Sequence, residues 1–279
     1  MVATPIGNLE DISLRAVNTL ALVDMIAAED TRITARLLEH HRVHGNLKAV
    51  HKHNEQRSAD WIVEMLAQGK SVALVTDAGT PAISDPGAMV VARVRASGFK
   101  VVPIPGPNAA ITALSAAGIA DSPFLFAGFL PPKSAARRKA LAALGELPCT
   151  LVFYEAPHRI VECVEDIARV LGAERKIVIA RELTKLFEQT HHCALADAAA
   201  WLRADPDRQR GEFVLIVPDS ASPRKAAAET DWERVLAVLL DELPLAHAVK
   251  LTCRLTGAKR KAAYERALQL AHRLKSRHS

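Results

Sequence analysis

Short apolar runs alternate with stretches of helical spacing along residues 1–117. The apolar runs have the length of single buried strands and end at polar, Gly or Pro residues: Val2–Thr4, Met25–Ala28, Leu47–Val50, Val72–Val75 and Val101–Ile104. Apolar residues at helical spacing follow these runs: Leu14–Val23, Ile33–His40, Asn54–Gln68, Ala88–Ser97 and Asn108–Ala117. This alternation predicts a mostly parallel sheet that is covered by helices on both faces.

The alternation breaks at the turn residues Gly118–Pro123. Further strands are predicted at Phe124–Phe129, Thr150–Tyr154, Lys176–Ala180, Phe187–Cys193 and Glu212–Val217. Further helices are predicted at Ser134–Leu144, Ile160–Leu171 and Asp197–Arg203. We therefore expect a second α/β domain, with more antiparallel pairing than the first.

The end of the chain is predicted to be helical. A segment rich in Ser, Ala, Pro and charge, residues 220–231, has the composition of a linker. Three helical patterns follow it: Trp232–Leu240, Ala246–Leu255 and Lys259–Leu274. A short turn around Gly257 separates the last two, as in a helix-turn-helix unit. We thus expect three domains, residues 1–120, 121–219 and 232–279. The linker, residues 220–231, joins the last two.

Small and bent residues follow two of the predicted strands. Val72–Val75 ends at Asp77–Pro81, and the next strand ends at Pro103–Asn108. Three other strands end in charged groups, at Glu29–Arg32, Glu155–Arg159 and Arg181–Thr184. Loops at the carboxyl ends of strands line the ligand crevice of open α/β sheets, so these segments are candidates for a binding site. The alternative is that they are ordinary connections between strands and helices.

The charge of the chain is concentrated at its end. Residues 246–279 hold nine Lys and Arg and one Glu, whereas the whole 279-residue chain has a net charge of only +5. A mildly acidic body with a basic tail predicts a polyanionic partner, most often nucleic acid. A tail that only increases solubility, or helices unrelated to nucleic acid, would give the same charge pattern.

Other classes of protein are disfavoured by the sequence. No apolar run approaches the ~20 residues of a membrane span, and no signal peptide is recognisable, so we expect no membrane partner. The four cysteines are scattered and the histidines match no standard zinc spacing, so we expect reduced thiols, a cytoplasmic location and no metal. Only three residues precede the TPIGN segment, whereas a central strand usually has about five. We therefore expect the natural chain to start upstream of Met1.

A series of motifs in a fixed order resembles one family. The motifs are TPIGNLxD, AAEDTR, HNEQ, VTDAGTPAISDPG, PIPGPNAAITALSAAG, GFLPPK, FYEAPHR, RELTK and RGEFVLIV. In this order they resemble the ribosomal RNA small-subunit methyltransferases I, within the tetrapyrrole methylase superfamily. The resemblance implies two α/β domains with S-adenosylmethionine in the cleft between them, and a homodimer. It also implies 2′-O-methylation of a cytidine in the decoding region of 16S rRNA in the small ribosomal subunit.

The same resemblance assigns a cofactor site residue by residue. It places eleven residues at the cofactor: Pro5, Ala78, Gly79, Thr80, Ile83, Asn108, Ala109, Tyr154, Glu155, Leu183 and Gly211. Asn108 and Ala109 begin a predicted helix, whose free N–H groups favour a carboxylate. The Gly-rich GxGxG fingerprint of common Rossmann methyltransferases is absent after the first strand, so the site rests on the family match. Plain turn geometry is the alternative for each small residue.

The reaction that the resemblance implies is an in-line attack of a ribose hydroxyl on a methyl carbon, so we expect alignment to be the main task of the enzyme. Base assistance is the second contribution, and we expect Glu155, Asp30 and Arg181 to act in catalysis, with His158 and Glu182 as further candidates. Basic residues are expected to contact RNA: Arg32, Lys133, Arg137, Arg138, Lys139, Arg159, Lys259, Arg260 and Lys261. Structural ion pairs are the alternative for each of them.

Two other functions remain open on the sequence alone. A methyltransferase acting on a small tetrapyrrole would share the fold, but it would not need the basic tail or the cluster at Lys133–Lys139. A regulator that binds nucleic acid without catalysis would use the tail, but it would not need the two Gly- and Pro-rich loops. Aromatic residues make up only 4% of the chain, so phosphate and shape contacts are expected to dominate RNA recognition.

Overall fold

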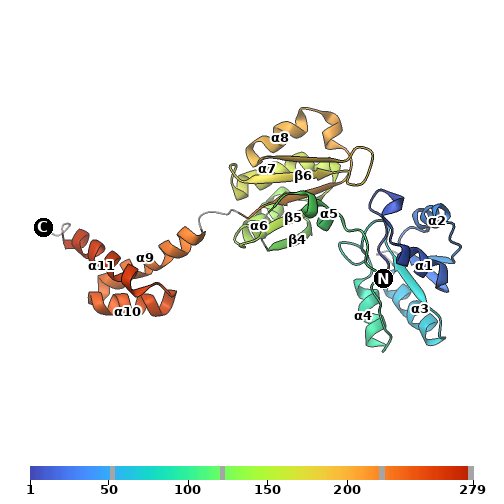
Figure 1. Ribbon diagram of the computed structural model, residues 1–279, viewed down its shortest axis with the longest axis horizontal. Coiled ribbons are helices and arrows are strands. Elements are labelled where there is room, and N and C mark those ends of the chain that lie inside the picture. The colour runs from blue at the N-terminus through green and yellow to red at the C-terminus, as the bar shows by residue number, and fades with distance from the viewer. Residues whose placement is uncertain (51–53, 120–122, 220–223, 276–279) are drawn as a thin grey trace. The chain divides into compact units, whose positions relative to one another are not determined.

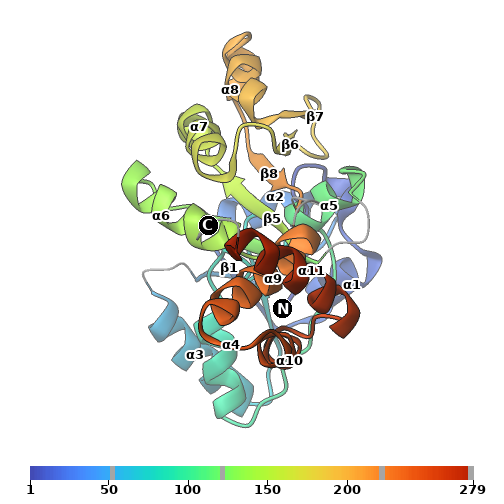
Figure 2. The ribbon, with the colours of Figure 1, turned by 90° about the vertical axis from the view of Figure 1, so that its left-hand side faces the viewer.

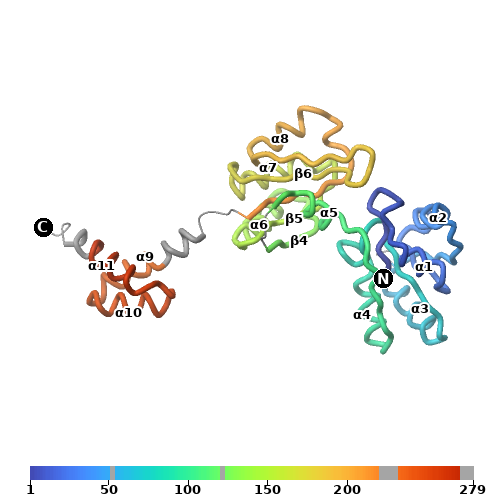
Figure 3. The backbone as a smooth tube through the Cα atoms, viewed as in Figure 1, coloured from blue at the N-terminus to red at the C-terminus, as the bar shows by residue number. Residues whose placement is uncertain are grey.

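The computed structural model describes residues 1–50, 54–119, 123–219 and 224–275. The chain divides into two units, Met1–Asp219 and Ser220–Ser279 (Figure 1). Figure 3 traces the backbone of both units. The domain boundary expected at residues 120 and 121 lies outside the described residues, and the division of the first unit there stays a prediction. No helix among the described residues combines the length and apolar character needed to cross a membrane.

Three short parallel strands form the first sheet, in the order β2-β1-β3. They are β1 (Met25–Ala28), β2 (Leu47–Ala49) and β3 (Val72–Val75). The N-terminal residues extend this sheet, because the Val2 amide donates to the Leu74 carbonyl at 2.9 Å and Val2 forms a parallel bridge with Ile104. The strand expected at Val101–Ile104 is wrong, since only Ile104 pairs. Pro103 and Pro105 flank it, and proline has no amide proton to donate to a ladder.

Helices cover both faces of this sheet, as expected. They are α1 (Leu14–Leu22), α2 (Thr31–His40), α3 (Glu55–Ala67) and α4 (Ala88–Ala96), with a 3-10 turn, η1 (Leu9–Asp11). Successive residues of β1 point to opposite faces: Ala28 packs in the cluster that contains Leu37, and Ala27 packs in the cluster that contains Val90. Asp30 caps α2 by accepting the Arg32 amide at 2.8 Å, which starts that helix ahead of the expected Ile33.

The second sheet is mixed, in the order β4-β5-β8-β6-β7. Its strands are β4 (Phe124–Phe129), β5 (Thr150–Glu155), β6 (Lys176–Arg181), β7 (Gln189–Ala194) and β8 (Phe213–Val217). Only β4 and β5 pair in parallel, while β8 lies antiparallel to β5 and β6, and β7 antiparallel to β6. The expected antiparallel character of this region is confirmed. The short turns η2 (Pro157–Arg159) and η3 (Pro206–Gln209) complete it.

Helices also cover both faces of the second sheet. One face packs against α6 (Ser134–Gly145), α7 (Ile160–Leu171) and α8 (Leu195–Arg203), with Phe153 of β5 in that core. The other face packs against α5 (Ala109–Ala116), where Ala110 and Ala113 share a core with Val152. Helix α5 follows the first sheet in the chain but packs on the second (Figure 1). It therefore joins the two halves of the first unit.

The second unit contains three helices, α9 (Arg224–Glu242), α10 (Leu245–Thr256) and α11 (Arg260–Lys275), which Figure 2 shows packed together. Their core includes Leu236, Val249 and Ala263. Gly257 ends α10 in the left-handed conformation, with φ of +72°, so that α11 can begin three residues later. Helix α9 begins at Arg224, ahead of the expected Trp232, so most of the segment expected as a linker is helical; its role as a linker stays a prediction.

Candidate active site

A cavity of about 350 Å³ opens within the first unit, between the loop after β3, the start of α5 and strands of the second sheet. That volume is within the range of small-molecule sites. Nine of the eleven residues that the resemblance placed at the cofactor line this cavity: Ala78, Gly79, Thr80, Ile83, Asn108, Ala109, Tyr154, Glu155 and Leu183. They come from four separate segments of the chain. The fold thus brings most of the expected site together.

The loop after β3 forms one wall of the cavity and is held in place by hydrogen bonds. Gly79, at φ of +83°, exchanges two backbone hydrogen bonds with Thr4, of 2.9 and 3.0 Å. The Thr80 hydroxyl donates to the Pro107 carbonyl at 3.0 Å, which ties this loop to the loop before α5. Ala82 and Ser84 also adopt positive φ, a conformation that costs non-glycine residues energy. Such strain persists only where the surroundings fix the backbone.

The first turn of α5 forms another part of the cavity wall together with Tyr154. The Asn108 side chain caps the helix by accepting the Ile111 amide at 3.2 Å, and the Ala110 amide donates to the Tyr154 hydroxyl oxygen at 3.1 Å. Burial raises the pKa of Tyr154 above its ordinary value of 10.0, so the hydroxyl keeps its proton and can donate it to a ligand. This wall presents hydrogen-bond donors and the positive end of a helix dipole.

Two of the expected cofactor residues do not line this cavity. Pro5 borders an adjoining hollow of about 410 Å³, which also includes Asp77 and Lys185. Gly211 has φ of +91°, and a Cβ atom there would lie 2.4 Å from the Glu182 side chain. Gly211 is therefore needed for close packing of a turn rather than for a cavity wall, while its neighbours Glu212, Phe213 and Val214 line the cavity.

Comparison with known proteins identifies the chain. Residues 1–200 match the family of tetrapyrrole (corrin/porphyrin) methylases, and residues 222–271 match the RsmI C-terminal HTH domain. The ribosomal RNA small subunit methyltransferase I of Escherichia coli O157:H7 is 48% identical over 269 residues, which cover 96% of this chain and 94% of the relative. That of Xylella fastidiosa (strain Temecula1) is 49% identical over 264 residues, which cover 95% and 96%.

The chain belongs to the ribosomal RNA small subunit methyltransferase I family. The resemblance found in its motifs is confirmed over nearly the full length. The fold is also that of a solved uroporphyrin-III C-methyltransferase from Thermus thermophilus, complexed with S-adenyl homocysteine. That structure superposes with a TM-score of 0.54 at 18% identity, covering 78% of this chain and 95% of that one. The expected two-sheet fold with a helical C-terminal region is confirmed.

Three carboxylates lie within electrostatic reach of one another in this methyltransferase, those of Glu29, Asp77 and Asp85. Glu29 accepts the Thr76 hydroxyl at 2.6 Å, and Asp77 accepts the Asp30 amide at 2.8 Å. The third, Asp85, lines the cavity. Burial raises the pKa of Asp85 to about 6, the negative charge of Glu29 adds to the shift, and a hydrogen bond with Thr76 opposes it. Sequence reasoning missed Asp85 although it lies within the quoted VTDAGTPAISDPG motif.

The three residues expected to act in catalysis do not meet at the cavity. Asp30 is outside its lining and binds Arg32, whose hydrogen bonds hold the pKa of Asp30 well below its ordinary value. Arg181 is also outside it, and its guanidinium donates to the carbonyls of Asp207 and Arg210. The polar groups of both are engaged elsewhere, and their catalytic roles stay predictions.

Glu155 does line the cavity, but its carboxylate is already bound. One oxygen accepts the Ala156 amide at 2.8 Å, and the other pairs with Arg159 at 3.1 Å. The side chain of Glu155 is fully buried. Arg159 also donates to the Leu130 carbonyl at 2.7 Å. These contacts favour a structural pair that shapes the wall, so Arg159 is corrected from an RNA contact to a partner of Glu155.

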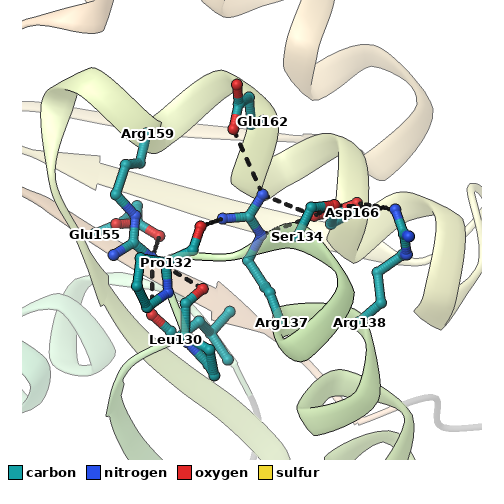
Figure 4. Close-up of polar contacts among 10 residues, drawn as sticks. Leu130, Pro132, Ser134, Arg137, Arg138, Glu155, Arg159, Glu162 and Asp166 are labelled. Atoms are coloured by element: carbon teal, nitrogen blue, oxygen red, sulfur yellow. Dashed lines mark hydrogen bonds and ion pairs between the residues drawn. The ribbon is translucent and has the colours of Figure 1, made fainter.

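Arg137 is buried, and its assignment to RNA is also wrong. Figure 4 shows its guanidinium between α6 and α7, where it pairs with Asp166 at 2.7 Å and donates to the Pro132 carbonyl at 3.2 Å. The side chain of Arg137 is 1% exposed. Arg138, by contrast, is 38% exposed while it contacts Asp166. The three adjacent cations Arg137, Arg138 and Lys139 point to different faces because a helix turns by about 100° per residue.

The other residues expected at RNA are exposed and remain candidates: Arg32, Lys133, Lys139, Lys259, Arg260 and Lys261. Arg32 is 86% exposed although it pairs with Asp30. In the second unit, Arg266 is instead half-buried and pairs with Glu233 at 3.0 Å, which joins α11 to α9. Among the described residues of this unit, Arg266 thus holds two helices together, whereas Lys259, Arg260 and Lys261 face solvent.

Proposed function

We propose that this chain binds S-adenosylmethionine in the 350 Å³ cavity and methylates the ribose 2′-oxygen of a cytidine in the decoding region of 16S rRNA. As a member of its family, it is a methyltransferase of small-subunit ribosomal RNA that depends on this cofactor. The observation that carries the site assignment is the convergence of nine expected residues, from four separate segments of the chain, on one cavity.

The groups around the cavity suit the cofactor. The capped first turn of α5 offers a positive dipole end to its carboxylate, and Tyr154 offers a hydroxyl donor. Apolar side chains, Ile83 and Leu183 among them, can cover its less polar parts. When bound, the cofactor supplies a methyl group activated by the adjacent sulfonium cation. The contribution of the chain is to orient the nucleophile, exclude water and accept a proton.

Calorimetric titration with S-adenosylmethionine tests the site. Ala109 lines the cavity at the start of α5, whereas Ala116 is exposed at the end of the same helix. We expect Ala109→Trp to fill the cavity and abolish binding, and Ala116→Trp to bind as the unmodified protein does. Binding that survives Ala109→Trp would remove the cavity as the cofactor site.

The RNA substrate is proposed to be an assembled ribosomal surface rather than a short strand. The chain has few aromatic residues for stacking single bases, and its exposed cations suit phosphates. Transfer of a tritiated methyl group from the cofactor should therefore be faster to unmethylated small subunits than to a free oligonucleotide of the same sequence. Equal rates on both substrates would contradict this proposal.

The assembly and location of the protein are proposed on the family resemblance and the substrate. We propose a homodimer, which light scattering of the purified full chain would report as twice the mass of the 30.2 kDa chain. We also propose that the protein acts in the cytoplasm, because small ribosomal subunits are found there. A monomeric mass at working concentration would overturn the proposed homodimer.

A further inference from the structure

We propose that Asp85 is the group that accepts the ribose hydroxyl proton during methyl transfer. This inference rests on the proposed function, since it names a residue for the same reaction at the same cavity. It replaces Asp30 and Glu155, whose carboxylates are engaged with arginines. Asp85 lines the cavity, and the partners identified for it are a hydroxyl and other carboxylates.

The backbone around Asp85 is held rigidly. Ser84 before it has φ of +66°, and the Ala82 amide donates to the Pro86 carbonyl at 3.2 Å across the turn. Glu55 then accepts the Gly87 amide at 2.9 Å, which fixes the end of the turn. On the other side, Gly128 approaches so closely that a Cβ there would lie 3.0 Å from the Ser84 hydroxyl oxygen. Turns with a strained backbone that the surrounding contacts hold in place are common at functional sites, where a side chain must be positioned.

Competition for the Thr76 hydroxyl favours a proton on one of two carboxyl groups, that of Glu29 or that of Asp85. The Thr76 hydroxyl is buried and lies 2.6 Å from a Glu29 oxygen, and it also hydrogen-bonds to Asp85. A hydroxyl has one proton to donate, so it cannot satisfy two carboxylates at once. Protonation of either carboxylate removes this competition for the hydroxyl proton. Asp85 is the one of the pair that lines the cavity, where it can exchange a proton with a substrate.

Burial and the neighbouring negative charges raise the pKa of Asp85. Burial is the largest cause of its raised pKa, and the carboxylates of Glu29, after β1, and Asp77, after β3, add to it. Tyr154 of β5 faces Asp85, whose charge contributes to the raised pKa of that hydroxyl. With a pKa of about 6, Asp85 is mostly deprotonated at neutral pH. That pKa is still close enough to neutral pH for the carboxylate to take up a proton readily.

The step balances without any further reactant. The O–H bond of the ribose breaks, and its proton passes to an Asp85 carboxylate oxygen. The ribose oxygen forms its new bond to the methyl carbon as the carbon–sulfur bond breaks, with that electron pair going to sulfur. Asp85 leaves the step as a neutral carboxylic acid and returns its proton to water. Charge is conserved, because a carboxylate and a sulfonium cation are both neutralised.

Asp85→Asn in the full chain is the first test, with methyl transfer to small subunits and cofactor binding measured side by side. We expect kcat to fall about 10²–10⁴-fold, the range for loss of a general base, while calorimetry reports unchanged binding of S-adenosylmethionine. In the unmodified enzyme kcat/KM should decline as pH falls through about 6, and this acidic limb should be absent from the residual activity of the variant.

Glu29→Gln is the second test, and it leaves Asp85 in place. Loss of the neighbouring negative charge should lower the pKa of Asp85 and move the acidic limb to lower pH. In protein labelled with ¹³C at aspartate, carboxyl NMR should show a group titrating near pH 6 that disappears in Asp85→Asn and shifts in Glu29→Gln. This measurement needs neither cofactor nor RNA, so it stays informative if the proposed substrate is wrong.

Four results would overturn the inference. Asp85→Asn with full activity would exclude the residue as the base, and loss of cofactor binding in that variant would make it a binding residue instead. An acidic limb that persists in Asp85→Asn, or an NMR titration unchanged by Glu29→Gln, would assign the proton to another group. Failure of the unmodified protein to bind the cofactor would instead reject the proposed function.

Discussion

Single residues show how burial changes the role of a charged side chain. Arg137 and Asp166 form a buried ion pair between α6 and α7, and the Ser134 hydroxyl donates to the same carboxylate at 2.7 Å. We expect Arg137→Met to lower the free energy of unfolding by about 3–5 kcal/mol, because it leaves Asp166 buried without its main partner. Lys139→Met, two positions later on the exposed side of α6, should change it by less than about 0.5 kcal/mol. Urea unfolding of both variants checks this, and equal losses would contradict it.

The same pair predicts a dependence of stability on pH. Burial by itself would raise the pKa of Asp166, but the hydrogen bonds from Ser134 and Arg137 outweigh it, so the pKa lies below its ordinary value of 3.8. Asp166 therefore stabilises the fold above pH 3.8, and this contribution is lost as pH falls from there through the lowered pKa. Unfolding measured as a function of pH should show a steeper acid loss in the unmodified protein than in Asp166→Asn. Parallel curves would count against the assignment.

Among the elements, helix α5 links the site to the second sheet, because its N-terminus forms part of the cavity wall and its apolar face packs on that sheet. Asn108→Ala removes the cap on the Ile111 amide and should cost about 1 kcal/mol of stability. It should also weaken binding of S-adenosylmethionine, since the first turn is no longer fixed. Asn108→Ser, which keeps a capping oxygen, should lose much less of both. Thermal unfolding and calorimetry of the two variants provide the comparison, and identical behaviour would argue that the cap is not used.

On the scale of the whole molecule, the C-terminal unit supplies positive charge that the cavity does not need. Lys259, Arg260 and Lys261 are exposed at the start of α11. Replacing all three by Gln should weaken RNA binding and reduce the slope of log affinity against log salt by about two to three, if each contacts a phosphate. Binding of S-adenosylmethionine should be unchanged. Filter binding to small subunits at several salt concentrations measures the slope, and an unchanged slope would exclude these residues from the RNA interface.

Local patterns in the sequence were sufficient for most elements. Met25–Ala28, Val72–Val75 and Phe124–Phe129 are strands at the predicted residues, because a short apolar run between turn residues carries its own signal. The motif order also identified the family, and it selected nine residues that line one cavity. These features depend on residues close together in the chain. Cofactor binding by those nine residues stays a prediction for the titration to test.

Only the tertiary structure decided the features that depend on distant residues. Ile104 pairs alone because two prolines flank it, and segment 224–231 is helical despite its linker-like composition. Arg137 is buried because Asp166, 29 positions away, compensates its charge. Asp85 has a raised pKa because folding excludes water from it and brings the negative charge of Glu29 close to it. Periodicity and motif spacing report local backbone and family, whereas burial and charge coupling arise only when separate segments meet.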